Sequence, residues 1–142
     1  TSQPWKTQYW VREVMNRMYK NHIRGLSGND DCGQMSAWYL FTAMGFYPVC
    51  PGTDQYVLGA PYLPYLKISL SNGKIFEIKA EGVSDKKRYV KSVRLNGVPY
   101  HKMYITHSDI LKGGVLEFVM SASPNKKRGQ ELVDKPYSLT TR

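Results

Sequence analysis

The densest group of residues that could do chemistry is one short run, Gly28-Asn29-Asp30-Asp31-Cys32-Gly33-Gln34. Two adjacent carboxylates stand there between amides and glycines, directly ahead of a strongly apolar helical pattern. A helix N-terminus carries a partial positive charge, which keeps nearby carboxylates ionised. An ionised carboxylate suits a general base or a metal ligand, whereas a general acid must hold its proton near neutral pH. The competing structural interpretation is a helix N-cap with a second acid in the first turn.

The two aspartates cannot form a glycosidase acid/base pair between themselves. Adjacent side chains diverge, while the two carboxyls of an inverting pair lie about 6.5–9.5 Å apart. A partner would have to come from elsewhere, and no other acid has a distinctive setting: Glu13, Asp54, Glu77, Glu81, Asp85, Asp109, Glu117, Glu131 and Asp134. Asp30 and Asp31 are therefore the candidate catalytic residues, and the chain offers no second catalytic carboxylate.

The histidines and cysteines show no metal-ligand spacing. His22, His101 and His107 are scattered, and no Cys-x-x-Cys pair occurs. Cys32 and Cys50 lie at opposite ends of a predicted helix, roughly 16 Å apart at 1.5 Å per residue. We interpret them as free or buried thiols rather than a disulfide. The sequence predicts no metal site within this chain.

Composition places the chain among folded proteins. It has 142 residues, of which 42% are hydrophobic and 22% charged, enough for one domain or a piece of a larger protein. No run approaches the ~20 apolar residues that span a bilayer, and the first residues do not resemble a signal leader. The formal charge is +9, but the basic residues are dispersed, whereas nucleic-acid binding needs them on one face. We therefore predict neither a membrane span nor a nucleic-acid partner.

Two helices are predicted in the first fifty residues. The first begins near Pro4 and its apolar stripe comprises Trp10, Val11, Val14, Met15, Met18 and Tyr19, with Arg12, Glu13, Asn16 and Arg17 off the stripe. The second covers residues 33–44; Asn29, Asp30 or Asp31 can cap it, and Gly45 suits its left-handed end. It is apolar almost all round, so it requires partners on every side. We infer that both belong to a larger helical array and that the chain is a fragment.

The pattern changes to a period of two after Gly52. Residues 65–70 and 74–80 flank one Asn-Gly pair, and residues 88–95 and 98–104 flank another, which predicts two hairpins. Pro99 makes the returning arm of the second hairpin an edge or bulged strand. A third turn is predicted at residues 109–114, between strands at 104–107 and 115–122. The expected fold class is α+β, with helices in residues 1–50, an antiparallel β-sandwich in 51–125 and a loop or tail in 126–142.

The acidic run also carries a resemblance to a known family. Gly-Asn-Asp-Asp-Cys-Gly-Gln-Met-Ser-Ala-Trp at residues 28–38, followed by Gly-Phe-Tyr-Pro-Val at 45–49, resembles the signature near the end of glycoside hydrolase family 92. The likeness continues at residues 6–12 upstream and at 56–59, 72–74 and 95–97 downstream, so it covers nearly the whole chain. An eleven-residue match with this acid–amide core is highly specific.

The resemblance implies a fold and a set of site residues. Members of the family are calcium-dependent, inverting, exo-acting α-mannosidases, several times longer than this chain, with a catalytic (α/α)6 barrel. Residues 1–50 would then be the two terminal helices of that barrel, followed by the closing β-structure. Asp31 matches the water-activating base, Asp30 falls where relatives carry either Asp or Glu, and Asn29 would help to arrange the substrate. Arg128 departs from the pattern, because an aromatic residue is expected there.

The function implied is that of a parent enzyme which removes terminal α-linked mannose from glycans. The general acid, a glutamate, and most calcium ligands would lie upstream, so calcium is a cofactor of the parent and the isolated fragment should be inactive. Its partners would be mannose-containing glycans and the rest of the parent chain, and the family places it in the periplasm or outside the cell. The alternative is a non-catalytic β-sandwich, which binds carbohydrate if aromatics line an exposed sheet face and supports a neighbouring domain if they are buried. The preferred linkage and the oligomeric state stay open.

Overall fold

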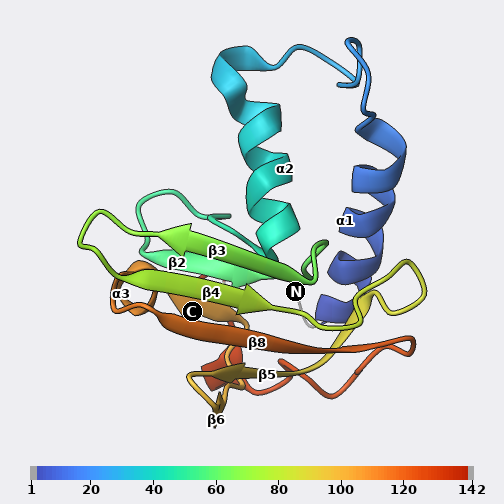
Figure 1. Ribbon diagram of the computed structural model, residues 1–142. Coiled ribbons are helices and arrows are strands. Elements are labelled where there is room, and N and C mark those ends of the chain that lie inside the picture. The colour runs from blue at the N-terminus through green and yellow to red at the C-terminus, as the bar shows by residue number, and fades with distance from the viewer. Residues whose placement is uncertain (1–2, 141–142) are drawn as a thin grey trace.

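A computed structural model describes residues 3–140 of the chain. Two helices, α1 (Pro4–Met18) and α2 (Gln34–Met44), stand side by side on one side of a β region, and residues 19–33 join them at the end far from the strands (Figure 1). A short helix, α3 (His107–Leu111), lies among the strands. The predicted α+β class, with helices first and strands after them, is confirmed. None of the helices within residues 3–140 has the length and apolar character needed to traverse a bilayer.

The strands form two sheets. The smaller contains, in spatial order, β1 (Phe46–Tyr47), β2 (Gln55–Leu58) and β7 (Tyr104–Thr106), all antiparallel. The larger contains, in spatial order, β3 (Tyr65–Ser69), β4 (Ile75–Lys79), β8 (Gly114–Ser121), β5 (Tyr89–Leu95) and β6 (Val98–Pro99). Both predicted Asn-Gly hairpins are present, as β3–β4 and β5–β6, but the returning arm of the second is only Val98–Pro99 instead of residues 98–104. Pro99 lies on the edge strand β6, as expected.

The predicted turn at residues 109–114 was wrong, and the predicted antiparallel arrangement has one exception. Residues 107–111 form α3 rather than a simple turn, because Thr106 and Asp109 make a reciprocal capping box at its start. The strands on either side of this helix, β7 and β8, lie in different sheets. As a result β8 runs parallel to β4, the one exception to an otherwise antiparallel arrangement in the described strands.

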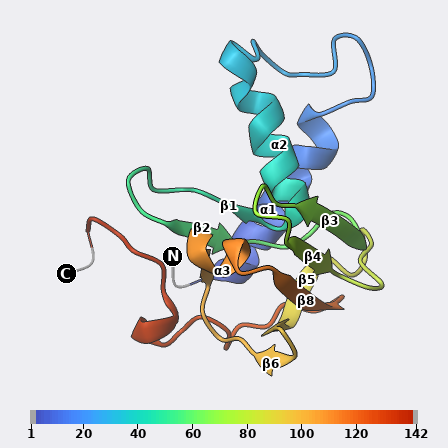
Figure 2. The same cartoon turned by 60° about the vertical axis from the view of Figure 1, so that its left-hand side comes forward.

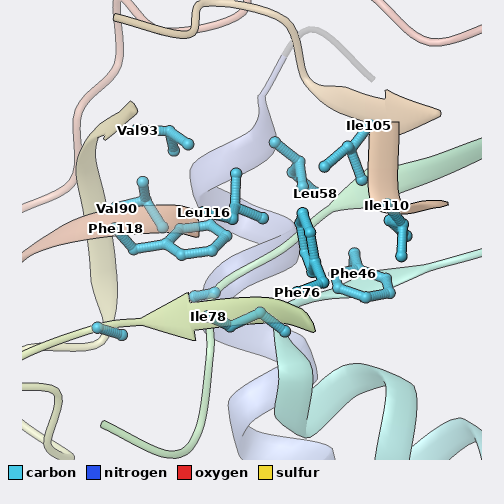
Figure 3. Packing of buried hydrophobic residues seen from close by; sticks show 12 residues of the cluster. Phe46, Leu58, Phe76, Ile78, Val90, Val93, Ile105, Ile110, Leu116 and Phe118 are labelled. Atoms are coloured by element: carbon cyan, nitrogen blue, oxygen red, sulfur yellow. The ribbon is translucent and has the colours of Figure 1, made fainter. Parts of the chain in front are cut away.

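The hydrophobic core lies between the two sheets (Figure 3). Phe76, Ile78, Ile105 and Leu116 have at most 1% of their surface exposed, and Phe46 and Phe118 pack with them. The phenylalanines of the strands therefore contribute to the core instead of lining an exposed sheet face. Burial of the phenylalanines favours a supporting role for the β region, although Tyr65 on the edge strand β3 is 50% exposed.

Helix α1 faces the β region with a side that the sequence pattern did not predict. Its buried residues are Gln8, Arg12 and Met15, while Trp10 of the expected apolar stripe is 62% exposed. Arg12 donates a hydrogen bond from Nη2 to the backbone oxygen of Pro61 at 2.7 Å, and its guanidinium lies over the ring of Tyr62. Unpaired backbone groups of the β region need polar partners, so the polar side of the helix is buried there. Of the predicted stripe only Met15 is buried, so the stripe was largely wrong as a prediction of the buried face.

Residues 126–140 of the predicted tail are mostly loop and include one 3-10 turn, η2 (Leu132–Asp134), while residues 141–142 lie outside the described residues. The tail is fastened to the β region, because Arg128 donates hydrogen bonds to the backbone oxygens of Tyr100 and Lys102. The backbone N–H of Met103 also donates to the carbonyl of Asp134 at 2.7 Å. The domain division at residue 50 stays a prediction; β1, which precedes that residue, pairs with β2, which follows it.

Candidate active-site turn

The acidic run lies at the N-terminus of α2, at the end of the helix pair that is remote from both sheets (Figure 2). A 3-10 turn, η1 (Asp31–Gly33), leads into the helix. Within it Cys32 and Gly33 both have positive φ angles, of 53° and 81°. Such a conformation costs a residue with a side chain about 1–2 kcal/mol. The turn is therefore a specific backbone arrangement that redirects the chain between Asp31 and α2.

Asp30 acts as the cap of α2. Its Oδ1 accepts hydrogen bonds from the backbone N–H groups of Met35 and Ser36 at 2.8 and 3.0 Å, and its Oδ2 accepts one from the hydroxyl of Ser36. Gly33, at the formal N-cap position, has no side chain to do this. The Ser36 hydroxyl bond, followed by the Ser36 N–H bond, lowers the pKa of Asp30 below its usual range. Both oxygens of Asp30 are thus committed to the helix.

Asp31 is different from its neighbour. Its side chain is exposed, and within residues 3–140 its carboxylate has no hydrogen-bond or ion-pair partner. Asn29, on the other side of Asp30, is exposed as well. The two adjacent acids therefore have separate settings: Asp30 holds the turn together, and Asp31 keeps a carboxylate that can accept a proton or a ligand hydroxyl.

Aromatic residues fasten the start of α2 to the chain that follows α1. The hydroxyl of Tyr19 donates a hydrogen bond to the carbonyl of Met35 at 3.1 Å. Its ring stacks on Trp38, with centroids 5.6 Å apart, and also contacts Tyr39. Burial, and then the negative charge of Asp30, raises the pKa of Tyr19. The sequence placed Tyr19 in the apolar stripe of the first helix and missed this contact, because Tyr19 in fact lies one residue past the end of α1.

A groove of about 410 Å³ lies beside the turn, between the end of α1 and the first turns of α2. Its lining residues are Tyr19, Lys20, Asn21, Leu26, Ser36, Tyr39 and Leu40. The side chain of Ser36 therefore connects this groove with the cap made by Asp30.

Within residues 3–140 no group of three or more His, Cys, Asp or Glu side chains is placed to hold a metal ion. Cys32 is exposed and Cys50 is partly buried, and both are free thiols, which confirms that interpretation over a disulfide.

Comparison with known proteins identifies the family. A family model described as the glycosyl hydrolase family 92 catalytic domain matches residues 1–122. The chain belongs to glycoside hydrolase family 92. A curated relative from Arthroderma benhamiae, described as an uncharacterised secreted glycosidase, is 31% identical over 105 residues, which is 72% of this chain and 14% of that protein.

Solved structures of this family match the fold closely. A family 92 inverting mannosidase from Bacteroides thetaiotaomicron is 43% identical with a TM-score of 0.90, over 96% of this chain and 18% of that one. A family 92 α-mannosidase from the same organism, solved with mannoimidazole, is 46% identical with a TM-score of 0.92, over 97% of this chain and 18% of that one. This chain therefore spans less than a fifth of the length of the relatives that it matches.

Proposed function

We propose that this chain is the C-terminal portion of a calcium-dependent, inverting exo-α-mannosidase that hydrolyses terminal α-mannosides of glycans. The observation that carries the proposal is the separation of Asp30 from Asp31 within a family 92 chain. Because Asp30 caps α2 with both oxygens, Asp31 is left as a fixed carboxylate with free acceptor capacity. The similar solved structures are described as mannosidases, which supports α-mannosides as the substrate class.

In this proposal Asp31 is the general base. Its carboxylate accepts a proton from a water molecule, the water oxygen forms a bond to the anomeric carbon, and the glycosidic bond breaks on the opposite face of the ring. The departing oxygen takes its proton from a glutamate that lies outside this chain. Since the water attacks opposite the leaving group, the configuration of the sugar is inverted. Asn29, exposed beside the acids, would donate to or accept from a substrate hydroxyl.

Asp30 serves the same reaction indirectly. Its capping bonds hold the first turn of α2, and that turn fixes the backbone from which Asp31 projects. Calcium would be bound by residues outside this chain and would position the mannose hydroxyls. The isolated 142 residues lack the general acid and should therefore be inactive.

The rest of the parent protein is the partner that the helices require. Trp10 and Leu40 are each 62% exposed, and Ile23 is 96% exposed. Apolar surface on two neighbouring helices marks a contact with further protein. We assign it to the remaining helices of the parent. The secreted relative supports a location in the periplasm or outside the cell.

The proposal is tested in the full-length protein with Asp31→Asn. We expect kcat on a terminal α-mannoside to fall by about 10²–10⁴, the usual contribution of a general base, with an unchanged thermal unfolding midpoint. Asp54→Asn is the matched control, because Asp54 is also exposed and lies in the β region. A kcat for Asp31→Asn within threefold of the parent value would exclude Asp31 as the base. NMR of the first product formed should show the β-anomer.

A further inference from the structure

A second pocket lies away from the acidic turn, between the β5–β6 hairpin and the C-terminal segment. Its volume is about 440 Å³. One wall comes from β5 and the residues after β6, and the other from residues 125–134. It shares no lining residue with the groove beside the acidic turn, so it is separate from the proposed active site.

An irregularity in β5 creates the first wall. The pairing of β5 with β8 shifts by one residue between Val90 and Ser92. Val90 and Val93 are buried on the core side, while Lys91, Ser92 and Arg94 are exposed. A β-bulge inserts an extra residue and re-aims side chains. Here it leaves Lys91 and Ser92, which are adjacent, both outside the core and beside the pocket.

The second wall is held in place by hydrogen bonds to the first. Asn125 donates from Nδ2 to the backbone oxygen of Lys91 at 2.8 Å, and its Oδ1 accepts from the N–H of Lys127. Arg128 donates to the carbonyls of Tyr100 and Lys102, at 2.9 and 3.1 Å. The segment that carries Lys127 is therefore fastened against β5, and the pocket has a defined shape.

The charges of this pocket are not neutralised within the protein. Lys91, Arg94 and Lys127 are exposed, and none has an ion-pair or hydrogen-bond partner for its side chain in the part of the chain that the structure describes. Two acids also line the pocket: Asp134 acts electrostatically on the partly buried Arg128, and Glu131 is exposed, so the basic lining residues outnumber the acidic ones. Cations gathered in a concave site raise the local concentration of anions.

Arg128 supplies an independent sign of a missing acceptor. Its Nε is the only side-chain nitrogen or oxygen that is buried without a hydrogen-bond partner among residues 3–140. Both of its terminal nitrogens donate hydrogen bonds, whereas the N–H of the third nitrogen, Nε, has no acceptor. An arginine nitrogen pairs well with an oxyanion.

We propose that this pocket binds a compact oxyanion, a phosphate or sulfate group, either free or as an ester on a glycan. Lys91, Arg94 and Lys127 would supply the charge, and Ser92 and Asn125 would supply neutral hydrogen bonds. The site is a function of the β region and goes beyond the proposed hydrolysis, because it involves neither Asp30 nor Asp31.

Isothermal titration calorimetry of the full-length protein tests the proposal, with inorganic phosphate, inorganic sulfate, mannose 6-phosphate and mannose as separate titrants. We expect saturable binding of at least one anionic titrant and at least tenfold weaker binding in the double variant Arg94→Gln with Lys127→Gln. The double variant Lys67→Gln with Lys86→Gln is the matched control. Both lysines are exposed and lie outside the pocket, and their replacement removes the same amount of positive charge. The control should bind within twofold of the parent protein.

The titrants also distinguish the source of the anion. Equal binding of inorganic phosphate and mannose 6-phosphate supports a site for the free ion, and binding of the ester alone supports a phosphorylated glycan. Absence of saturable binding for every anion, or an equal loss of binding in both double variants, would overturn the proposal. Mannose reports binding at the proposed active site, which the pocket variants should leave unchanged. If the double variant does not fold, Lys127→Gln alone, on the tail, replaces it with the same expected direction. The binding experiment does not use the activity of Asp31→Asn. The proposal of an anion site and the proposal of mannoside hydrolysis are therefore tested independently.

Discussion

The side-chain oxygen of Gln8 accepts a hydrogen bond from the backbone N–H of Val90, 82 residues further along the chain, at 3.1 Å. Gln8 is 4% exposed and Val90 is 2% exposed, so the bond is buried. Val90 stands at the irregularity in β5, where the ladder to β8 is interrupted. Helix α1 thus contributes a side chain where a regular strand would have found a backbone partner.

Replacement of Gln8 should weaken this contact. In Gln8→Ala the N–H of Val90 stays buried without an acceptor, which costs about 1–3 kcal/mol. We expect a lower thermal unfolding midpoint and faster hydrogen exchange in the peptide that contains Val90. Gln3→Ala is the control, because Gln3 is exposed and its side chain makes no capping bond. Unchanged exchange at Val90 would show that another group takes over as acceptor.

Arg12 should contribute more to stability than its exposed neighbour. It is 3% exposed, donates to Pro61 at 2.7 Å and lies 4.5 Å from the ring centroid of Tyr62. Loss of a charged hydrogen bond and a cation–π contact in Arg12→Met should cost about 2–4 kcal/mol. Arg17→Met removes a guanidinium that is 74% exposed and should change stability by less than about 1 kcal/mol. Chemical denaturation of the two variants compares them, and equal effects would refute the role given to Arg12.

Asp30 should make stability depend on pH in acid. Its pKa is lowered in the folded protein, chiefly by the Ser36 hydroxyl, so the unfolded chain binds its proton at a higher pH than the folded chain does. The stabilisation is therefore present above the unfolded value, about pH 4, and is lost as the pH falls through the lower folded value. We expect the difference in unfolding midpoint between the parent protein and Asp30→Asn to shrink as the pH is lowered from 6 to 2.

Ser36→Ala provides the second arm of that experiment. Without the hydroxyl the folded pKa of Asp30 should rise toward its usual value, so the acid dependence should become shallower while the carboxylate remains. If the difference in unfolding midpoint between the parent protein and Asp30→Asn stays constant from pH 6 to 2, Asp30 is not the capping residue whose protonation changes stability.

Replacement by alanine should destabilise the protein to different extents at two glycines that both have positive φ angles, Gly45 and Gly73. Gly45 and Gly73 have φ angles of 94° and 80°, so both substitutions incur left-handed strain of about 1–2 kcal/mol. A Cβ at Gly45 would also come within 2.7 Å of the Pro61 ring, whereas one at Gly73 would meet nothing within 4 Å. Gly45→Ala should therefore destabilise the protein by clearly more than Gly73→Ala, as measured by thermal unfolding. Equal midpoints would show that Pro61 moves aside.

Local signals predicted the elements that depend on local chemistry. The Asn-Gly pairs at Asn72 and Asn96 predicted both hairpins, and Gly45 predicted the end of α2, because these turns need particular backbone angles. The run around Asp31 was also found from residue types alone, and its family likeness gave the expected chemistry. None of these required knowledge of distant contacts.

The buried face of α1 was missed because its partners are distant in sequence, and two other misses depend on local geometry. Helical spacing identified α1 but not its buried face, because the acceptors and donors opposite Gln8 and Arg12 come from backbone far along the chain. The short helix after Thr106 was missed because its four-residue capping signal sits among strand patterns. Which of two adjacent acids caps α2 was likewise undecided by sequence, since it depends on where Ser36 points once the turn has formed.

The place of β8 in the larger sheet sets an order of assembly. It is the last strand in the chain, yet it lies at the centre, between β4 on one side and β5 on the other. The two hairpins can form as soon as they leave the ribosome, but they share no ladder until β8 arrives between them. During synthesis, the apolar sides of both hairpins would stay exposed until residues 114–121 are made. In a nascent chain stalled before Gly114, this exposed apolar surface would be available for chaperone binding.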